Sequence, residues 1–98
     1  MTLHAFSVSL TVHKFTLEIV DEQDVYLPEG AEPLCIQVQW RDPQLWALVD
    51  PTKPLAPRKI RAFGTGHPIP PGENLRYLGT IQKQDGALVF HFFEVLPA

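Results

Sequence analysis

Apolar and polar residues alternate along most of the chain, as they do in β-strands with one buried face. Residues 34–40 place Leu, Ile, Val and Trp at every second position. In the first twenty residues the alternation changes parity at His13-Lys14, which predicts a bulge or bend inside one long N-terminal strand. No segment shows a helical period. The pattern predicts an all-β fold of about seven antiparallel strands, either a small β-sandwich or a partly open barrel.

Prolines, glycines and one Asp-Gly pair divide the chain into the expected strands. Pro43 suits the first central position of a turn at residues 41–44, and the three prolines of residues 51–57 predict an unpaired connector. Asp85-Gly86 predicts a hairpin turn before a last strand that is apolar on both faces. Such a strand should be central in a sheet or covered by a second subunit. Further strands are expected at residues 24–27, 34–40, 45–49, 58–63, 75–82 and 87–95, around a core of Leu17, Ile36, Val38, Leu48, Ile60, Leu78, Leu88, Phe90 and Phe92.

The composition is that of one globular domain. The 98 residues suffice for one modest core, and 45% of them are apolar. The single cysteine, Cys35, excludes an internal disulfide and a cysteine-based zinc site. No apolar run reaches the length of a membrane span. We therefore expect a cytoplasmic protein that uses no metal and no cofactor.

Charge is segregated along the chain, although the net charge is only −3. Six acids and no base fall within residues 18–32, and four of the eight bases fall within residues 53–61. The negative net charge disfavours generic nucleic-acid binding, but it leaves room for a local anion site. The acidic segment could instead imitate a nucleic-acid backbone toward a protein partner.

Residues 60–72 are the first candidate for a binding site, because basic residues lead into two glycines and a proline-stiffened loop. The amides of Gly64, Thr65 and Gly66 could form a nest for a phosphate or carboxylate. The segment is neither a Walker loop nor a dinucleotide fingerprint. The alternative is a strand-ending turn in which the glycines serve only the backbone conformation. The expected ligand-binding residues are Arg58, Lys59, Arg61, Gly64, Thr65, Gly66 and His67.

Trp40 and Trp46 flank the predicted turn and should lie near each other across a hairpin. If exposed, they would anchor a partner; if buried, they would cap the core. Asp50, Thr65 and His67 can be combined into a catalytic group on paper, but no spacing in the sequence requires it. We expect no catalytic residues. The expected partner contacts are Trp40, Trp46, Asp21, Glu22 and Asp24.

Three segments carry a family resemblance: LWALVDP at residues 45–51, FGTGHPIP at residues 63–70 and YLGT at residues 77–80. With further matching segments between residues 12 and 95, the chain resembles a family of small uncharacterised phage and prophage proteins. The resemblance implies a single domain at residues 12–98. Residues 1–11 are then an N-terminal extension, expected to form a strand that contacts another subunit. The resemblance brings no established function, fold or catalytic residue.

Three functions stay open at this point. The first is a non-enzymatic counter-defence protein in the infected bacterial cell, which sequesters a nucleotide-like phosphorylated signal or inhibits a host defence protein. The second is a minor virion or assembly protein that forms oligomers. The third is a small nucleotide-processing hydrolase that uses His67. We expect a binding protein without turnover, associated into a homodimer or larger symmetric oligomer through Phe6, Val8, Leu10 or the last strand.

Overall fold

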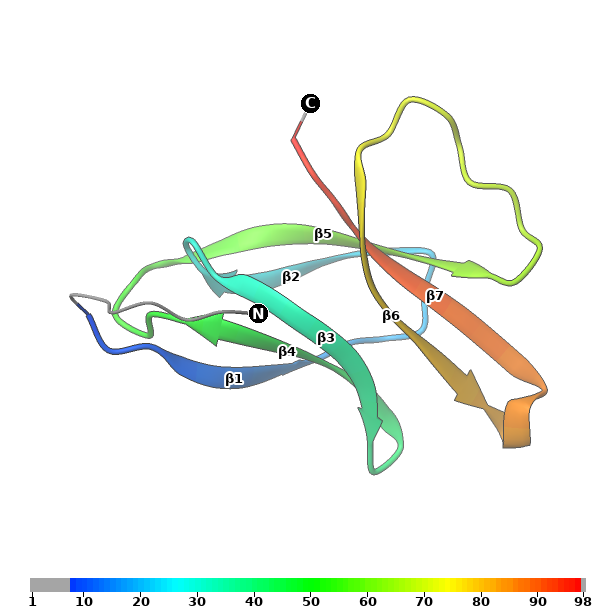
Figure 1. Ribbon diagram of the computed structural model, residues 1–98, viewed down its shortest axis with the longest axis horizontal. Helices are drawn as coiled ribbons and strands as arrows, with labels where there is room; N and C mark the ends of the chain where they lie inside the picture. The colour runs from blue at the N-terminus through cyan, green and yellow to red at the C-terminus, as the bar shows by residue number, and fades with distance from the viewer. Residues whose placement is uncertain (1–7, 98) are drawn as a thin grey trace.

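The computed structural model of the protein describes residues 8–97, which form two antiparallel β-sheets packed against each other (Figure 1). The first sheet has the strand order β1-β4-β3 and the second has the order β2-β5-β7-β6. This confirms the expected all-β sandwich of seven strands, and the sheets do not close into a barrel. No helix among the described residues is long and apolar enough to cross a membrane. The elements are β1 (Thr11–Thr16), β2 (Glu22–Pro28), β3 (Glu32–Gln39), β4 (Asp42–Val49), β5 (Leu55–Gly64), β6 (Leu75–Lys83), the single 3-10 turn η1 (Gln84–Gly86) and β7 (Leu88–Val95).

The last strand is central in the second sheet, as its apolar faces predicted. β7 lies between β5 and β6, and a hairpin turn joins it to β6. Asp85 has a φ of 53° and Gly86 a φ of 91°, so the Asp-Gly pair adopts the positive φ values expected of it. Along β7 the even-numbered residues face the core and the odd-numbered residues face outward, because successive side chains of a strand point to opposite faces.

The core lies between the sheets and is built from alternate positions of the central strands. Leu45, Ala47 and Val49 of β4 and Phe92 of β7 are almost fully buried. Five of the nine expected core residues are buried, namely Leu17, Ile36, Ile60, Leu78 and Phe92.

The other four expected core residues are at most half-buried. Phe90 packs against the core cluster from its edge, and Leu48 is half-buried because alternation turns it to the outer face of β4. The prediction was wrong for Val38 and Leu88, which are 41% and 42% exposed. Val38 lies near the tip of the β3–β4 hairpin and Leu88 near the tip of the β6–β7 hairpin, where the strands extend beyond the core.

The expected bulge at His13-Lys14 is absent, since β1 pairs with β4 in one register from Thr11 to Thr16. The change of parity in the sequence has another cause: both faces of β1 carry apolar residues. Phe15 packs on the core, whereas Val12 is exposed on the outer face. Register shifts occur instead in β3, between Pro33 and Cys35, and in β6, between Tyr77 and Gly79.

Two prolines lie in strands where the sequence predicted a turn and a connector. Pro43 pairs with Val38 near the start of β4, so the β3–β4 turn consists of Trp40 and Arg41. Pro57 pairs with Tyr26 inside β5.

Pro57 is tolerated because its nitrogen needs no partner. The N–H of Ala62 donates to the carbonyl of Asp21 at 3.1 Å, so even-numbered residues of β5 direct their backbone groups toward β2. The nitrogen of Pro57 faces the other side of β5, where pairing with β7 begins only at Ile60. A proline at a strand edge without a neighbour removes no ladder hydrogen bond.

The two sheets approach each other closely where β6 crosses β3. A Cβ atom placed on Gly79 would lie 2.7 Å from the carbonyl oxygen of Ile36 and 3.1 Å from its Cβ. Backbone cannot move away as a flexible side chain can, so the position requires glycine. The absence of a side chain at Gly79 therefore sets the distance between the sheets at this crossing.

We predict that Gly79→Ala lowers the free energy of unfolding by about 1–3 kcal/mol or more, the usual cost of overpacking a tight core. Urea denaturation measures the change. Gly64→Ala is the matched control, because its Cβ would meet only the exposed ring of His67, at 3.0 Å. Equal losses for the two variants would contradict the proposed crossing constraint.

Candidate functional site

The three bases of the expected anion site lie on two faces of β5 and do not converge. Arg58 shares the inner face with Ile60 and Ala62, both of which are buried. Lys59 and Arg61 point to the outer face. Strand alternation separates the bases, although they are adjacent in the sequence.

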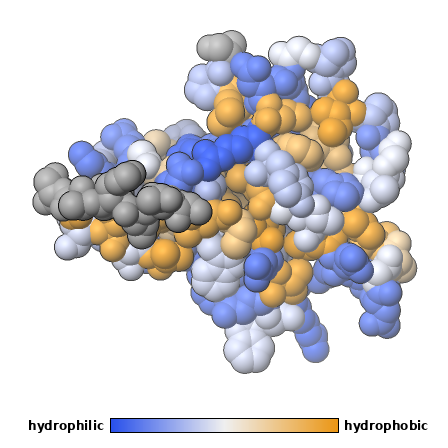
Figure 2. Space-filling view, in the orientation of Figure 1, coloured by the Kyte–Doolittle hydropathy of each residue, from blue (hydrophilic) through white to orange (hydrophobic). Residues whose placement is uncertain are grey.

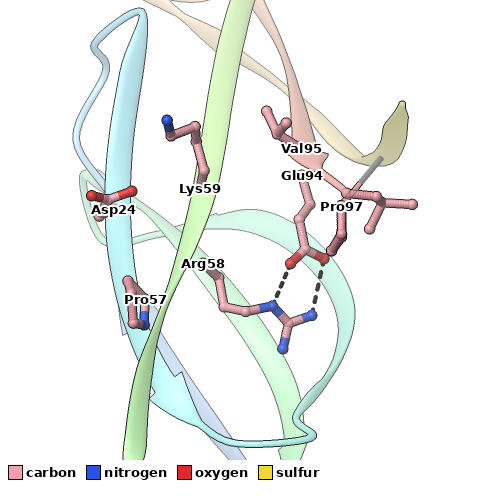
Figure 3. Close-up of a pocket in the computed structure, with 8 residues that line it drawn as sticks. Asp24, Pro57, Arg58, Lys59, Glu94, Val95 and Pro97 are labelled. Atoms are coloured by element: carbon pink, nitrogen blue, oxygen red, sulfur yellow. Dashed lines mark hydrogen bonds and ion pairs between the residues drawn. The ribbon is translucent and has the colours of Figure 1, made fainter. Parts of the chain in front are cut away.

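Arg58 is bound inside the molecule (Figure 3). Its Nε and Nη2 donate to the two carboxylate oxygens of Glu94, the second at 3.1 Å, and its Nη1 donates to the carbonyl of Ala31 at 3.0 Å. Glu94 is 2% exposed. A bidentate pair of this kind neutralises a charge that would be costly to bury alone. Arg58 therefore has a structural role and offers no free charge to a ligand.

A cavity of about 470 Å³ opens between β5 and the end of β7, beside this ion pair (Figure 3). Its rim carries the opposite charges of Lys59 and Asp24, so it has no single-sign field to attract an anion. The remaining lining residues are Pro57, Val95, Leu96 and Pro97.

The acidic and basic segments face each other across the β2–β5 ladder. Glu22 is the register partner of Arg61, and Asp24 is the register partner of Lys59. Lys59 Nζ lies 3.7 Å from Glu22 Oε1, and Arg61 Nη1 lies 2.6 Å from Glu73 Oε2. The expected anionic surface and the expected basic cluster are thus one surface of mixed charge. This disfavours both electrostatic hypotheses.

The Gly64–His67 segment forms a tight turn, closed by a 3.1 Å hydrogen bond from the N–H of His67 to the carbonyl of Gly64. Gly66 has a φ of 86°, a conformation that favours glycine. At Gly64 the missing side chain makes room for the imidazole of His67, whose Cε1 would lie 3.0 Å from a Cβ. The glycines are accounted for by the turn and by this contact, which supports the alternative of a strand-ending turn.

Sequence reasoning missed a row of hydrogen-bonded side chains on the outer face of the second sheet. Thr65 Oγ1 lies 2.6 Å from His91 Nε2, and His91 Nδ1 lies 3.0 Å from Thr80 Oγ1. Thr80 Oγ1 lies 2.6 Å from the hydroxyl of Tyr77. We call these four residues the hydroxyl–imidazole row. It brings together the β5–β6 loop, β6 and β7, and therefore the segments 63–70 and 77–80.

Aromatic side chains adjoin the row on the same face. The ring of Phe93 lies 5.6 Å from that of Tyr77 and 5.9 Å from that of Phe63, both in edge-to-face orientation. The guanidinium of Arg61 lies 4.9 Å from the centre of the Phe63 ring. Tyr77 is 57% exposed. The row and Phe93 form what we call the outer face, a flat surface with both aromatic and hydrogen-bonding groups.

A cleft surrounds His67 at the end of the sandwich where β5 ends and β7 begins. It consists of two adjoining cavities, of about 90 and about 240 Å³, which share Gly64, His67 and Phe90. Figure 2 shows hydrophobic residues in several separate patches, one of them toward the start of β7. We call this the His67 cleft; its other lining residues are Ile19, Val20, Asp21, Ala62, Thr65, Ala87, Leu88 and Val89.

The two tryptophans do not form one patch. Trp40 lies in the β3–β4 turn and is 90% exposed. Trp46 lies on the outer face of the first sheet, where it is half-buried between its register partners Lys14 and Cys35. Only Trp40 projects as an anchor would.

The chemistry of these groups favours binding. Asp50 accepts hydrogen bonds from the hydroxyl and the N–H of Thr52, which hold the pKa of its carboxyl below the ordinary value, and it does not approach His67. His91 is oriented by hydroxyl groups rather than by a carboxylate. Within residues 8–97 no three His, Cys, Asp or Glu side chains are grouped so that they could hold a metal ion.

Comparison with protein families places residues 9–98 in the family described as Domain of unknown function (DUF7352). The match covers nearly the whole chain, and the protein belongs to this family. No curated protein and no solved structure matches the chain.

We predict that Thr65→Val breaks the hydroxyl–imidazole row at one end and leaves the fold intact. The nitrogen resonance of His91 Nε2 should shift in a ¹⁵N NMR spectrum, and the free energy of unfolding should fall by about 0.5–1.5 kcal/mol at most. Thr52→Val, which removes a hydroxyl far from the row, should leave the His91 resonances unchanged. Unchanged His91 resonances in Thr65→Val would contradict the contact.

Proposed function

We propose that the protein is a phage-encoded, non-enzymatic counter-defence protein that inhibits a host protein by binding it through the outer face. The observation that carries this proposal is the prearranged row of Thr65, His91, Thr80 and Tyr77 beside the exposed edge of Phe93. Aromatic residues with hydrogen-bonding groups are enriched in the centres of protein interfaces.

The row favours recognition because its side chains are already held in place. Each hydroxyl has a fixed neighbour, so binding costs little side-chain entropy. Tyr77 offers a large and mostly exposed ring whose hydroxyl is oriented by Thr80. A partner that presents peptide groups and an apolar side chain would find donors, acceptors and aromatic surface in one plane.

A protein partner is favoured over a phosphorylated small molecule by the state of the bases. Arg58 is paired with Glu94, Arg61 with Glu73 and Lys59 with Glu22. A phosphate would have to compete with these carboxylates for each cation. Imitation of a nucleic acid is also disfavoured, because bases alternate with acids across the β2–β5 ladder.

The proposal is tested by co-expressing outer-face variants with bacterial defence systems during phage infection. Tyr77→Ala combined with Thr80→Val should abolish protection of the phage and weaken binding of the inhibited protein about 30-fold or more, the effect of losing an interface hot spot. The control is Lys59→Ala with Arg61→Ala, which removes charge beside the outer face and should retain most activity. Full activity of the Tyr77/Thr80 variant would overturn the proposed surface.

A thermal-shift screen against mono-, di- and cyclic nucleotides separates the two forms of the hypothesis. We predict no stabilisation by any of them. A rise in melting temperature that disappears in the Lys59/Arg61 variant would instead establish a nucleotide signal as the ligand, since a ligand stabilises the state it binds.

A further inference from the structure

Trp40 is in a conformation and an environment that the isolated chain does not explain. It is the most exposed of the large hydrophobic residues described, at 90%, and its φ is 61°. A bulky residue in the left-handed region is strained, and glycine or asparagine normally occupies such a turn position. The tryptophan therefore costs stability and buries almost nothing within its own chain.

The turn that carries Trp40 is braced from two directions. Lys83 Nζ, at the end of β6 in the other sheet, donates to the carbonyl of Arg41 at 2.6 Å. Lys14 Nζ of β1 donates to Gln39 Oε1 at 2.5 Å. Both residues that flank Trp40 are thus tied to neighbouring strands. A side chain presented on a fixed support needs little ordering when it docks.

The His67 cleft lies on the same side of the molecule, one residue pair away from this brace. Lys83, which contacts the turn, is the register partner of Leu88, and Leu88 lines the cleft. Its other walls include Val89 and Phe90, which are half-buried, while Thr65 and His67 supply polar atoms. An indole has an apolar body and one N–H donor, and this cleft offers apolar walls with a hydroxyl and an imidazole at its edge.

We propose that two copies of the chain associate about a two-fold axis, each inserting Trp40 into the His67 cleft of the other. The chain itself supplies an unfilled apolar cleft and an unburied anchor side by side. In a two-fold interface the same surface meets itself, so an anchor beside its own receptor forms the contact twice. A second copy is the occupant for which both halves of the match are present. Tyr77, Thr80 and Phe93 lie outside this interface, so the inference does not depend on the proposed function.

The contact differs from the one expected from the sequence. Phe6 lies outside the described residues, and Val8 and Leu10 are not part of the cleft. The start of the last strand, which was also expected at a subunit contact, does form a wall of the cleft. That expectation remains a prediction, now with Trp40 as its partner.

Trp40→Gly tests the anchor without endangering the fold, because glycine suits the positive φ. The variant should unfold at the same temperature as the parent monomer or higher, and its dissociation constant for self-association should rise about 30-fold or more. Sedimentation equilibrium between about 1 and 100 µM covers the range expected for such an interface. In a Trp46→Phe background, the emission of Trp40 should shift to the blue with rising concentration.

A mixing experiment tests the reciprocal contact itself. Leu88→Asp places a charge in both clefts of a dimer and, like Trp40→Gly, should leave a monomer. Mixed together, the two variants should form a heterodimer, because Trp40 of one meets the intact cleft of the other. Trp46→Phe is the matched control and should associate like the parent. A parent chain that is monomeric at about 100 µM, or variants that associate as well as it does, would overturn the proposal.

Discussion

A buried carboxylate in the central strand of the larger sheet determines how this molecule is organised. Glu94 is 2% exposed, and its charge is matched by the guanidinium of Arg58 on the neighbouring strand. Arg58 also binds the carbonyl of Ala31, in the turn between β2 and β3. One side chain therefore connects β5, β7 and the crossing between the two sheets. The pair lies next to the last residue pair of the β5–β7 ladder, Ile60 and Glu94, where backbone pairing ends and side chains take over.

The same pair sets the register of the surface proposed to bind a partner. In β7 the even residues Phe92 and Glu94 face the core, whereas the odd residues His91 and Phe93 face outward. A slip of one residue would turn His91 inward and expose Glu94. By fixing Glu94 against Arg58, the fold also places His91 between Thr65 and Thr80. Core electrostatics and outer-face geometry are thus two consequences of one register.

Local signals were sufficient for much of the fold and little of the site. Alternation and the Asp85-Gly86 turn predicted the strands and the central place of the last one, because these depend on neighbouring residues. The partners of each charge depend on pairing between distant strands, so the contact of Glu22 with Lys59 could not be read from the sequence. His91 was assigned to an apolar strand, and nothing local shows that its face also carries Thr80. The prolines misled because the unpaired side of β5 at Pro57 exists only in the folded sheet.

The central claim is that Arg58 serves Glu94 and no ligand, and a double-mutant cycle tests it most directly. Arg58→Met and Glu94→Leu should each lower the free energy of unfolding by about 3–5 kcal/mol, because each leaves a buried charge without its partner. The double variant should be much closer to the parent, since apolar residues of similar size replace both charges. Urea denaturation of the four proteins gives the coupling energy. Single variants of near-parental stability, or losses that simply add, would contradict the account.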